Sequence, residues 1–359
     1  MAEGRQEDHP GVVLTVNAGS SSLKLTVLDQ RQRRLWQQQH GLNAAELGAP
    51  NGELPESIDS WLRQQLEPWT QRVELVVHRL VHGGMEYRGA TRLSATVRED
   101  LTRLIPLAPL HNGPALRLIA WTQAWLGASE ASPPQWACFD TAFHRTLPPE
   151  ARTYAIPQEW RQMGLQRFGF HGLNHQHLAE VVRVPRLISC HLGAGCSLCA
   201  IRDGQSIATT MGFTPLDGLV MATRSGSLDP GVVLHQLRAG LSADQLELAL
   251  NHQSGLLGLS GLSGDMLELR TAAAQGHAGA QLAIAVFRHQ LLQGIGAMAA
   301  SLGGVDAIAL SGGIGEHDGA LREELSQALA WLPRFELVQV AADEEGLMAR
   351  TCLAAGAGR

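Results

Sequence analysis

The same pattern of strand, small turn and strand occurs twice in this chain. VVLTVNAGSSSLKLTVLD covers residues 12–29, and LISCHLGAGCSLCAIRDG covers residues 187–204. In both stretches, two runs of β-forming residues flank a turn of small residues, and an aspartate follows the second run. A supersecondary unit that recurs at the point where a second domain would begin predicts a duplicated lobe.

The turn of the first hairpin is suited to an oxyanion such as a phosphate. Asn17, Gly19, Ser20 and Ser22 offer an amide, hydroxyls and accessible backbone N–H groups with little side-chain bulk, and Lys24 adds a positive charge. An ordinary serine-rich hairpin turn is the alternative, because glycine and serine are common in turns. The turn alone does not separate the two.

Composition excludes several classes of function. The 359 residues suggest about two domains, and the net charge of −6 lacks the basic field of a nucleic-acid binder. The N-terminal residues form no apolar signal segment, and no run reaches the ~18 apolar residues of a membrane span. The five cysteines favour buried reduced thiols over a zinc or redox site. We therefore expect a cytoplasmic protein with no nucleic-acid or membrane partner.

Two charged residues occur where buried strands are predicted to end. The run 73–84 indicates a strand that contains His78 and Arg79, and the run 136–139 ends at Asp140. An arginine there is costly unless it meets an anion or an internal carboxylate. The carboxyl ends of strands are where open α/β sheets bind ligands, although Asp140 could also cap a helix or turn.

The segment LAPLHNGPAL predicts a loop followed by a helix. Pro114 suits the first position of that helix, with Asn112 or Gly113 as its cap, so His111 is expected in the preceding loop.

The segment GFHGLNHQH contains three histidines before a helix predicted from about Asn174. Only His171 and His175 have i, i+4 spacing, and the glycine between them argues against one continuous helix. Without an acidic partner nearby, a metal site at His171, His175 and His177 is not favoured.

Two further glycine-rich stretches complete the pattern. Residues 214–231 form a long loop with one basic residue, Arg224, and residues 305–329 predict a strand, a glycine turn and a helix capped by Asp318. No Walker A motif is present. Three turns suited to phosphate, two arginines, loop histidines and a strand-end aspartate together favour phosphoryl transfer, which needs charge neutralisation, a metal and in-line positioning.

These residues lie within motifs that resemble the acetate kinase family. The motifs, in order, are NAGSSSLK, HRLVHGG, LAPLHNGP, FDTAFH, GFHGLNH, HLGAG, MGFTPLDGLVMATRSGSLDP and SGGIGE. The resemblance implies an α/β, two-lobed, duplicated ribonuclease-H-like (actin-like ATPase) fold with the active site in the interlobe cleft. Its first lobe would comprise residues 1–143 and 346–359, and its second lobe residues 144–345.

The resemblance also implies an activity. The family carries out reversible, Mg²⁺-dependent transfer of the ATP γ-phosphoryl group directly to acetate, giving acetyl phosphate and ADP, with Mn²⁺ a possible substitute. Its precedent is a homodimer formed through the second lobe. Propionate as the acceptor, or a different phosphoryl donor, is the alternative within the same chemistry.

Roles carry over motif by motif. Arg79 and Arg224 resemble the pair that binds the carboxylate and the transferring phosphoryl group, for which planar guanidinium groups are suited. His171 resembles the residue that hydrogen-bonds phosphoryl oxygens, and His111 a neighbour that helps to hold the site. Asp140 resembles the carboxylate that positions the substrate and helps to fix the metal.

Other family positions line binding sites. The expected metal residues are Asn17 and Glu344. The expected acetate pocket consists of Arg79, Val81, Leu110, Phe170 and Pro215. The expected nucleotide-binding residues are Lys24, Ser20, Ser22, His191, Gly193, Gly195, Asp265, Met266, Gly312, Gly313, Ile314 and Gly315.

The chain departs from the family pattern at Ala194, Leu267 and His317, where the family has asparagine, arginine and asparagine. These departures are on the nucleotide side. A catalytically weak nucleotide-binding regulator is therefore a further alternative. Retention of the catalytic residues argues against it, and these are Arg79, Arg224, Asp140, His171 and Glu344.

Overall fold

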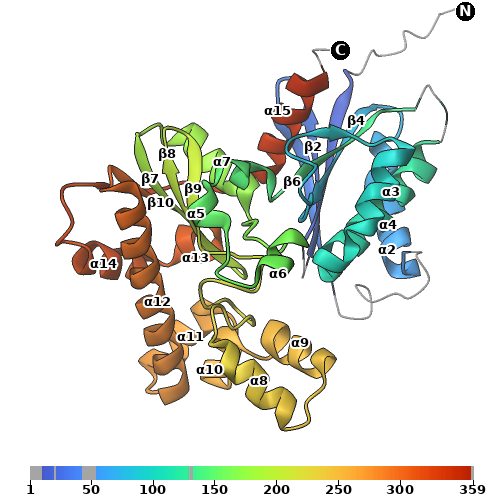
Figure 1. Cartoon of the computed structure of the whole chain (residues 1–359). Coiled ribbons are helices and arrows are strands. Elements are labelled where there is room, and N and C mark those ends of the chain that lie inside the picture. Colours follow the sequence, from blue (N-terminus) through green and yellow to red (C-terminus); the bar gives the residue numbers. More distant parts are fainter. Residues whose placement is uncertain (1–9, 20–21, 43–53, 128, 130–131, 357–359) are drawn as a thin grey trace, which may run out of the picture. The chain divides into compact units, whose positions relative to one another are not determined.

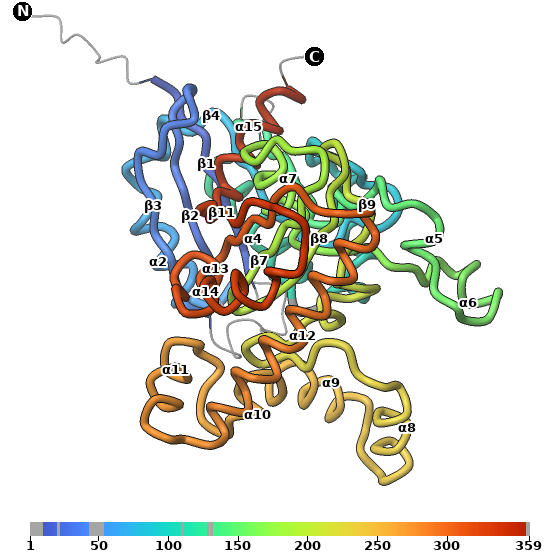
Figure 2. The backbone as a smooth tube through the Cα atoms, turned by 90° about the vertical axis from the view of Figure 1, so that its left-hand side faces the viewer, coloured from blue at the N-terminus to red at the C-terminus, as the bar shows by residue number. Residues whose placement is uncertain are grey.

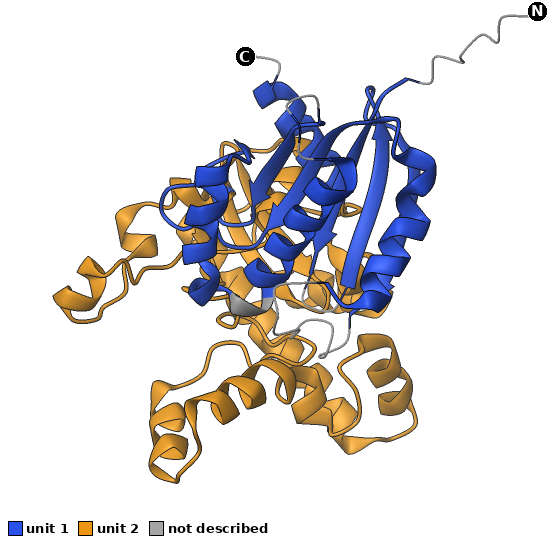
Figure 3. Ribbon diagram, turned by 90° about the vertical axis from the view of Figure 1, so that its right-hand side faces the viewer, with its two compact units in different colours: residues 1–142, 343–359 blue, residues 143–342 orange. Residues whose placement is uncertain are grey.

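The computed structural model describes residues 10–19, 22–42, 54–127, 129 and 132–356. The chain divides into two compact units, coloured separately in Figure 3. Unit 1 contains Met1–Ala142 and Asp343–Arg359, and unit 2 contains Phe143–Ala342. The boundary at Asp343 comes slightly before the one expected between 345 and 346, so Glu344 and Glu345 belong to unit 1. Ser20 lies outside the described residues.

Unit 1 contains a mixed sheet with the strand order β3-β2-β1-β4-β6-β5. Its strands are β1 (Val12–Ala18), β2 (Ser22–Asp29), β3 (Arg34–Gly41), β4 (Val73–Leu80), β5 (Thr91–Arg92) and β6 (Gln135–Phe139). Strands β1, β2 and β3 form an antiparallel meander, whereas β4 runs parallel to β1 and β6 runs parallel to β4. The carboxyl ends of β1, β4 and β6 therefore lie at one edge of the sheet.

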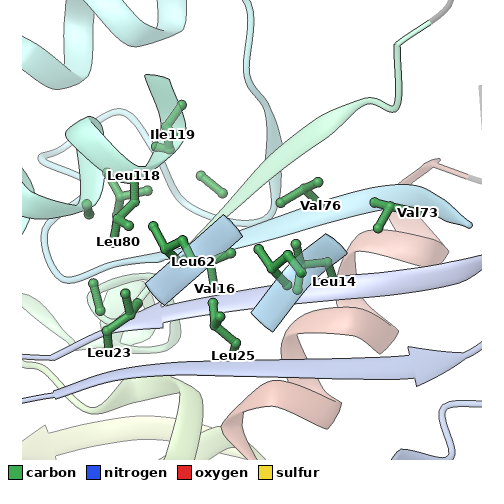
Figure 4. Packing of buried hydrophobic residues seen from close by; sticks show 14 of the residues in the cluster. Leu14, Val16, Leu23, Leu25, Leu62, Val73, Val76, Leu80, Leu118 and Ile119 are labelled. Carbon is green, nitrogen blue, oxygen red and sulfur yellow. The ribbon is translucent and has the colours of Figure 1, made fainter. Parts of the chain in front are cut away.

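Helices cover both faces of this sheet. They are α2 (Glu56–Leu66), α3 (Ala95–Arg103), α4 (Pro109–Leu126) and α15 (Glu344–Gly356), with short 3-10 turns at η1 (Glu67–Trp69) and η2 (Ile105–Leu107). Leu62 of α2 and Leu118 and Ile119 of α4 belong to one buried hydrophobic cluster with Val16 and Leu25, and Figure 4 shows these side chains. Helix α15 contacts β1, β4 and β6 from the other side. The period-2 alternation of the strands thus sends every second side chain towards α15.

His78 is buried between β4 and α4, and its Nε2 lies 2.9 Å from Gln135 Oε1. Burial lowers the pKa of His78 from 6.5 to about 4. As the pH falls from 6.5 to 4, this histidine therefore binds a proton in the unfolded chain but stays neutral in the folded protein. We expect the unfolding free energy to fall by about 3 kcal/mol over that window from His78 alone.

The His78→Gln variant tests this pH dependence because it removes the titrating group and keeps polar atoms. Its unfolding free energy should vary less with pH between 6.5 and 4 than that of the wild type. Urea unfolding followed by tryptophan fluorescence is suited to the measurement, because six of the eight tryptophans belong to unit 1. The exposed His252→Gln change in unit 2 is the control. Equal slopes for wild type and His78→Gln would refute the assignment.

Unit 2 repeats the topology of unit 1. Its sheet has the order β11-β10-β7-β8-β9. The strands are β7 (Arg186–Leu192), β8 (Cys196–Arg202), β9 (Gln205–Thr209), β10 (Ala307–Ser311) and β11 (Glu336–Gln339). Again three strands form an antiparallel meander, and two further strands run parallel to the first. The duplication predicted from the two hairpins is confirmed.

Helix α7 (Gly172–Val181) packs on one face of this sheet, where Leu178 meets Leu187, Cys199 and Ala307. The other face is covered by the long helix α12 (Ala278–Leu302), which lies against Leu198 at Gly294.

The remaining helical segments of unit 2 surround this core. Figure 2 shows α12 running from the sheet to a group of helices formed by the middle of the chain. The segments are η3 (Ala142–Thr146), α5 (Pro149–Arg152), α6 (Gln158–Gln162), α8 (Pro230–Arg238), α9 (Ala243–His252), α10 (Gly255–Ser260), α11 (Met266–Ala274), α13 (Gly312–His317) and α14 (Gly319–Ala328). None of the described helices is both long enough and apolar enough to span a membrane.

Candidate functional site

A cluster of charged groups forms where β1, β4 and β6 of unit 1 end. Asn17 is near the end of β1, Arg79 is near the end of β4, and Asp140 directly follows β6. Glu344 and Glu345 join them from the first turn of α15. Alternation along the strands explains why these side chains meet. Asn17 and Arg79 lie at odd-numbered positions, whereas their even-numbered neighbours Val16 and Leu80 belong to the hydrophobic cluster on the side of α2 and α4.

Arg79 is the centre of the cluster. Its Nε and Nη2 donate to the two carboxylate oxygens of Asp140 at 2.9 and 2.6 Å, and its Nη1 donates to Asn17 Oδ1 at 3.0 Å. Glu344 Oε2 lies 3.2 Å from the same Nη1. Burial alone would lower the pKa of Arg79, but the charges of Asp140 and Glu344 raise it above its usual range. The sequence predicted that Arg79 would meet either a bound anion or an internal carboxylate. In the structure it is paired with internal carboxylates.

Glu345 extends the cluster to the first hairpin. Asn17 Nδ2 donates to Glu344 Oε2 at 3.0 Å and to Glu345 Oε1 at 2.8 Å, and Lys24 Nζ lies 2.9 Å from Glu345 Oε2. Asn17 and Lys24 are direct partners in the β1–β2 register, which explains how both reach α15. Ser22 begins β2, and Gly19 N–H donates to its carbonyl to close the turn.

The cluster is suited to a hard divalent cation. Its potential ligands are oxygens of Asn17, Asp140 and Glu344, and three carboxylates share two cationic side chains. Within the described residues, no group of three or more His, Cys, Asp or Glu side chains is arranged so that it could hold a metal ion by itself. Magnesium does not need one, because it is commonly held by one or two carboxylates together with water and substrate phosphates.

The prediction for His111 needs correction. Helix α4 already begins at Pro109, so His111 lies in its first turn and Pro114 lies inside the helix. Asn112 does not cap the helix; it accepts from His82 N–H at 3.1 Å and donates to His82 O at 2.9 Å. The helix starts earlier because Pro109 has the φ angle of a first helical residue, while Asn112 has partners on the segment after β4.

The residues predicted to form the acetate pocket come from both units. Val81 is buried directly after β4, and Leu110 lies in the first turn of α4, both in unit 1. Phe170 is buried in unit 2, and Pro215 is half-buried there.

Unit 2 brings His171, His191, Gly195 and Arg224 together. The rings of His171 and His191 have centroids 4.3 Å apart. A Cβ placed on Gly195 would lie 3.1 Å from His171 Nε2 and 3.6 Å from Arg224 Nη1, so this glycine allows the imidazole and the guanidinium to share one small space. Arg224 lies in the glycine-rich loop, as expected, and its Nη1 donates to Pro215 O at 3.2 Å.

The turn of the second hairpin follows β7 and is built from Gly193, Ala194 and Gly195. Gly193 N–H donates to Gly195 O, and the exposed Ala194 accepts a hydrogen bond from Ala222 N–H through its carbonyl. His191 occupies the same place before this turn that Asn17 occupies before the first one.

The predicted adenosine segment is helical rather than a turn. Gly312, Gly313, Ile314 and Gly315 belong to the short helix α13, which follows β10 directly. Glu316 Oε1 accepts from Gly312 N–H at 2.9 Å and thereby holds the start of the helix.

The predicted cap Asp318 and the predicted nucleotide-binding residues Asp265 and Met266 all lie at helix starts. Asp318 caps α14 through Leu321 N–H, as predicted. Asp265 caps α11 by accepting from Glu268 N–H, and Met266 is buried as the first residue of that helix.

Gly312 and Gly313 form a matched pair of substitution sites. Gly312 has φ +81°, and a Cβ there would lie 2.7 Å from Leu192 O, whereas a Cβ on Gly313 meets nothing within 4 Å. We expect Gly312→Ala to lower stability by about 1–3 kcal/mol. Gly313→Ala should keep or slightly raise stability.

If the backbone of Gly313 approaches the nucleotide, Gly313→Ala should raise the KM for ATP about tenfold, an effect near 1.4 kcal/mol. Thermal unfolding and steady-state kinetics measure the two quantities separately. An unchanged KM in the stable Gly313→Ala variant would count against nucleotide contact at this segment.

Sequence reasoning missed several polar residues that shape the site. Glu345 binds Asn17 and Lys24, and Glu316 holds Gly312. Ser189 and Ser197 lie beneath α7 and bind His175. One usable signal was the presence of hydroxyl residues at alternate positions of otherwise apolar strands.

Both units therefore share one strand topology, and each has polar groups at the ends of its central strands. This arrangement defines a duplicated, actin-like ATPase fold, as expected from the sequence. The chain belongs to the acetokinase family, whose model matches residues 12–349.

Individual relatives agree with this assignment. The acetate kinase of Synechococcus sp. is 42% identical over 356 residues, covering 89% of this chain and 87% of the relative. The crystal structure of Porphyromonas gingivalis acetate kinase superposes with a TM-score of 0.82 at 27% identity, over 96% of this chain and 99% of that one. The crystal structure of a propionate kinase from Francisella tularensis superposes with a TM-score of 0.83 at 29% identity, over 95% of this chain and 98% of that one.

Proposed function

We propose that this chain transfers the γ-phosphoryl group of ATP reversibly to acetate, with Mg²⁺ as the cation. The observation that carries the proposal is the pairing of Arg79 with Asp140 and Glu344 at the strand ends of unit 1, within a chain of the acetokinase family. A half-buried guanidinium held in this way has the planar donor geometry that a carboxylate requires.

The acceptor needs no general base. Acetate is already ionised at neutral pH, so one of its oxygens attacks the γ-phosphorus directly while the bond from phosphorus to the β–γ bridging oxygen breaks. ADP leaves with that bridging oxygen, and no proton moves. Asp140 therefore acts by orienting Arg79 and, with Asn17 and Glu344, by holding the metal.

Stabilisation of the transferring group falls to the residues around Gly195 in unit 2. Arg224 neutralises charge on the equatorial oxygens, and His171 donates a hydrogen bond to one of them. The absence of a side chain at Gly195 leaves room for these contacts. When bound, Mg²⁺ would be held by oxygens of Asn17, Asp140 and Glu344 and would supply positive charge to offset that of the phosphates. Val81, Leu110, Phe170 and Pro215 are proposed to select a small acyl group, with His111 helping to hold the site.

The proposed activity is tested by trapping the acyl phosphate with hydroxylamine. Acetate and propionate are each supplied with ATP, GTP or pyrophosphate, and Mn²⁺ replaces Mg²⁺ in a parallel series. We expect acetyl hydroxamate with acetate and ATP, and less product with propionate, because an apolar pocket discriminates by only about 1–3 kcal/mol per methylene. Product with pyrophosphate but not ATP would favour another donor, in line with the exposed Ala194 in the second hairpin turn. No hydroxamate with any donor would refute the enzyme assignment.

We also propose a homodimer formed through unit 2. Apolar side chains of α8 and α9 are exposed, among them Val232, Leu234, Leu237 and Leu248. A second copy of the chain would cover them. Light scattering at micromolar concentration gives the mass, and a monomer would refute this proposal. A cytoplasmic location stays a prediction.

A further inference from the structure

A chain of four hydrogen-bonding side chains runs beneath α7 in unit 2. Ser189 Oγ lies 2.7 Å from His175 Nδ1, His175 Nε2 lies 2.8 Å from Ser197 Oγ, and Ser197 Oγ lies 3.0 Å from His171 Nδ1. Ser189, His175 and Ser197 are fully buried, and His171 is nearly so. The chain begins in the core of the unit and ends at the histidine beside Arg224 and Gly195.

The fold explains why these side chains meet. Ser189 on β7 and Ser197 on β8 face α7, because they alternate with the side chains that face α12. His175 occupies the second turn of α7, directly over both serines. His171 is the N-cap of the same helix and has φ +56°, a left-handed conformation that a residue with a side chain adopts only where its surroundings impose it.

The direction of the hydrogen bonds follows from Ser189. In the part of the chain that the structure describes, His175 is the single side-chain hydrogen-bond partner of the Ser189 hydroxyl. An orphaned buried donor is rarer than an under-used acceptor, so this hydroxyl donates to His175 Nδ1. Neutral His175 then carries its proton on Nε2 and donates to Ser197. Ser197 in turn donates to His171 Nδ1, which leaves the proton of neutral His171 on Nε2.

The surroundings keep His175 uncharged. Burial lowers its pKa well below 6.5, and the neighbouring His144 and His191 act in the same direction. The ring of His144 lies 5.7 Å from that of His175 and interacts with Ser206 and the carbonyl of Phe170. Charged or titratable groups near His171 include His191, whose ring centroid is 4.3 Å from that of His171, and Arg224 across Gly195.

We propose that Ser189, His175 and Ser197 are positioning residues that hold His171 as a neutral Nε2–H donor directed at a phosphoryl oxygen. The proposal rests on the proposed function, because it assigns His171 a phosphoryl oxygen as partner. A second proton on His171 would require Ser197 to reverse its hydroxyl and His175 to move its proton to Nδ1. The Ser189 hydroxyl would then lose its acceptor. This hydrogen-bond relay, from Ser189 through His175 and Ser197 to His171, therefore fixes both the tautomer of His171 and the orientation of its ring.

Two pairs of variants test the relay. His175→Leu removes both polar ends, whereas His175→Gln keeps an N–H that can donate to Ser197. Ser197→Ala removes the central hydroxyl, whereas Ser197→Thr keeps it. We expect His175→Leu and Ser197→Ala to lower kcat about tenfold to a hundredfold, as loss of an orienting partner commonly does. The KM values for acetate and ATP should change less than about threefold, because bound-state contacts stay. The Gln and Thr variants should recover most of the loss.

A spectroscopic measurement without substrate separates positioning from general structural support. Long-range ¹H–¹⁵N spectra of the full chain, with His171 assigned by the His171→Gln variant, report which ring nitrogen carries the proton. In wild type, His171 should be in the Nε2–H form. On acidification, this form should persist to a lower pH in wild type than in Ser197→Ala. Circular dichroism checks folding, and if His175→Leu does not fold, the Ser197 pair decides the question.

The outcomes are distinguishable. The relay is wrong if His171 in wild type carries its proton on Nδ1. It is also wrong if His175→Gln lowers kcat as much as His175→Leu does. If His171→Gln lowers kcat while the relay variants do not, the relay is wrong and the proposed function stands. If wild type makes no acyl phosphate, the proposed function is wrong, and the spectra still decide whether the relay sets the His171 tautomer.

Discussion

Replacing Arg224 with alanine is expected to lower kcat by about a factor of a thousand, as for other preorganised charged donors to a transferring phosphoryl group. The fold should be retained, because Arg224 lies in a loop of unit 2. The variant loses local contacts of Nη1, which donates to Pro215 O and approaches Met221 Sδ. The hydroxamate assay and steady-state kinetics measure the loss. Circular dichroism and thermal unfolding check the fold.

Two companion variants sharpen this experiment. Arg224→Lys keeps the charge but loses the planar pair of donors, so its kcat should lie between those of wild type and the alanine variant. Arg238→Ala removes an exposed arginine at the end of α8 and should leave kcat unchanged. Near-normal turnover in Arg224→Ala would show that this residue does not contact the phosphoryl group.

Replacing Arg79 with alanine is expected to abolish activity and also to destabilise unit 1. The variant leaves Asp140, whose side chain is 1% exposed, without its guanidinium partner, and it removes the guanidinium nitrogen that lies 3.2 Å from Glu344 Oε2. Breaking a buried pair from one side typically costs about 3–5 kcal/mol. Urea unfolding followed by tryptophan fluorescence should show this as a lower midpoint.

A double variant separates the structural and catalytic roles of Arg79. Removing both partners in Arg79→Ala/Asp140→Ala should recover part of the lost stability, because the buried Asp140 carboxylate is removed together with its guanidinium partner. Activity should stay lost, since the guanidinium proposed to bind acetate is still missing. Arg63→Ala is the control in the same unit: its exposed pair with Asp59 should contribute less than about 1 kcal/mol. Recovered activity in the double variant would contradict the role proposed for Arg79.

Much of the fold could be predicted from sequence because its signals are local. The strands β1, β2, β4 and β6 occur where alternating or continuous runs of β-forming residues predict them, and helix α2 covers the stretch expected around 58–66. The Gly-rich loop around Arg224 and the cap at Asp318 are also local features. The two hairpins were enough to indicate duplication.

Sequence signals failed where one local preference competes with a distant partner. Pro114 and Asn112 looked like the start of a helix, but Pro109 starts it and Asn112 binds His82. The glycines after β10 were predicted to form a turn, but they begin helix α13, where Glu316 accepts a hydrogen bond from Gly312 N–H. Spacing alone does not reveal such partners, because they become neighbours only after the chain has folded.

By itself, the sequence determined the duplicated strand topology and the chemical types gathered at the strand ends: arginine, aspartate, histidine and small turn residues. Only the tertiary structure decided how those groups are paired. Glu345 reaches Lys24 because α15, at the far end of the chain, packs back on the first sheet. His171 receives its orientation from serines on two strands under α7. The physical reason is that strand alternation is encoded locally, whereas hydrogen-bond partners depend on which faces are brought together in three dimensions.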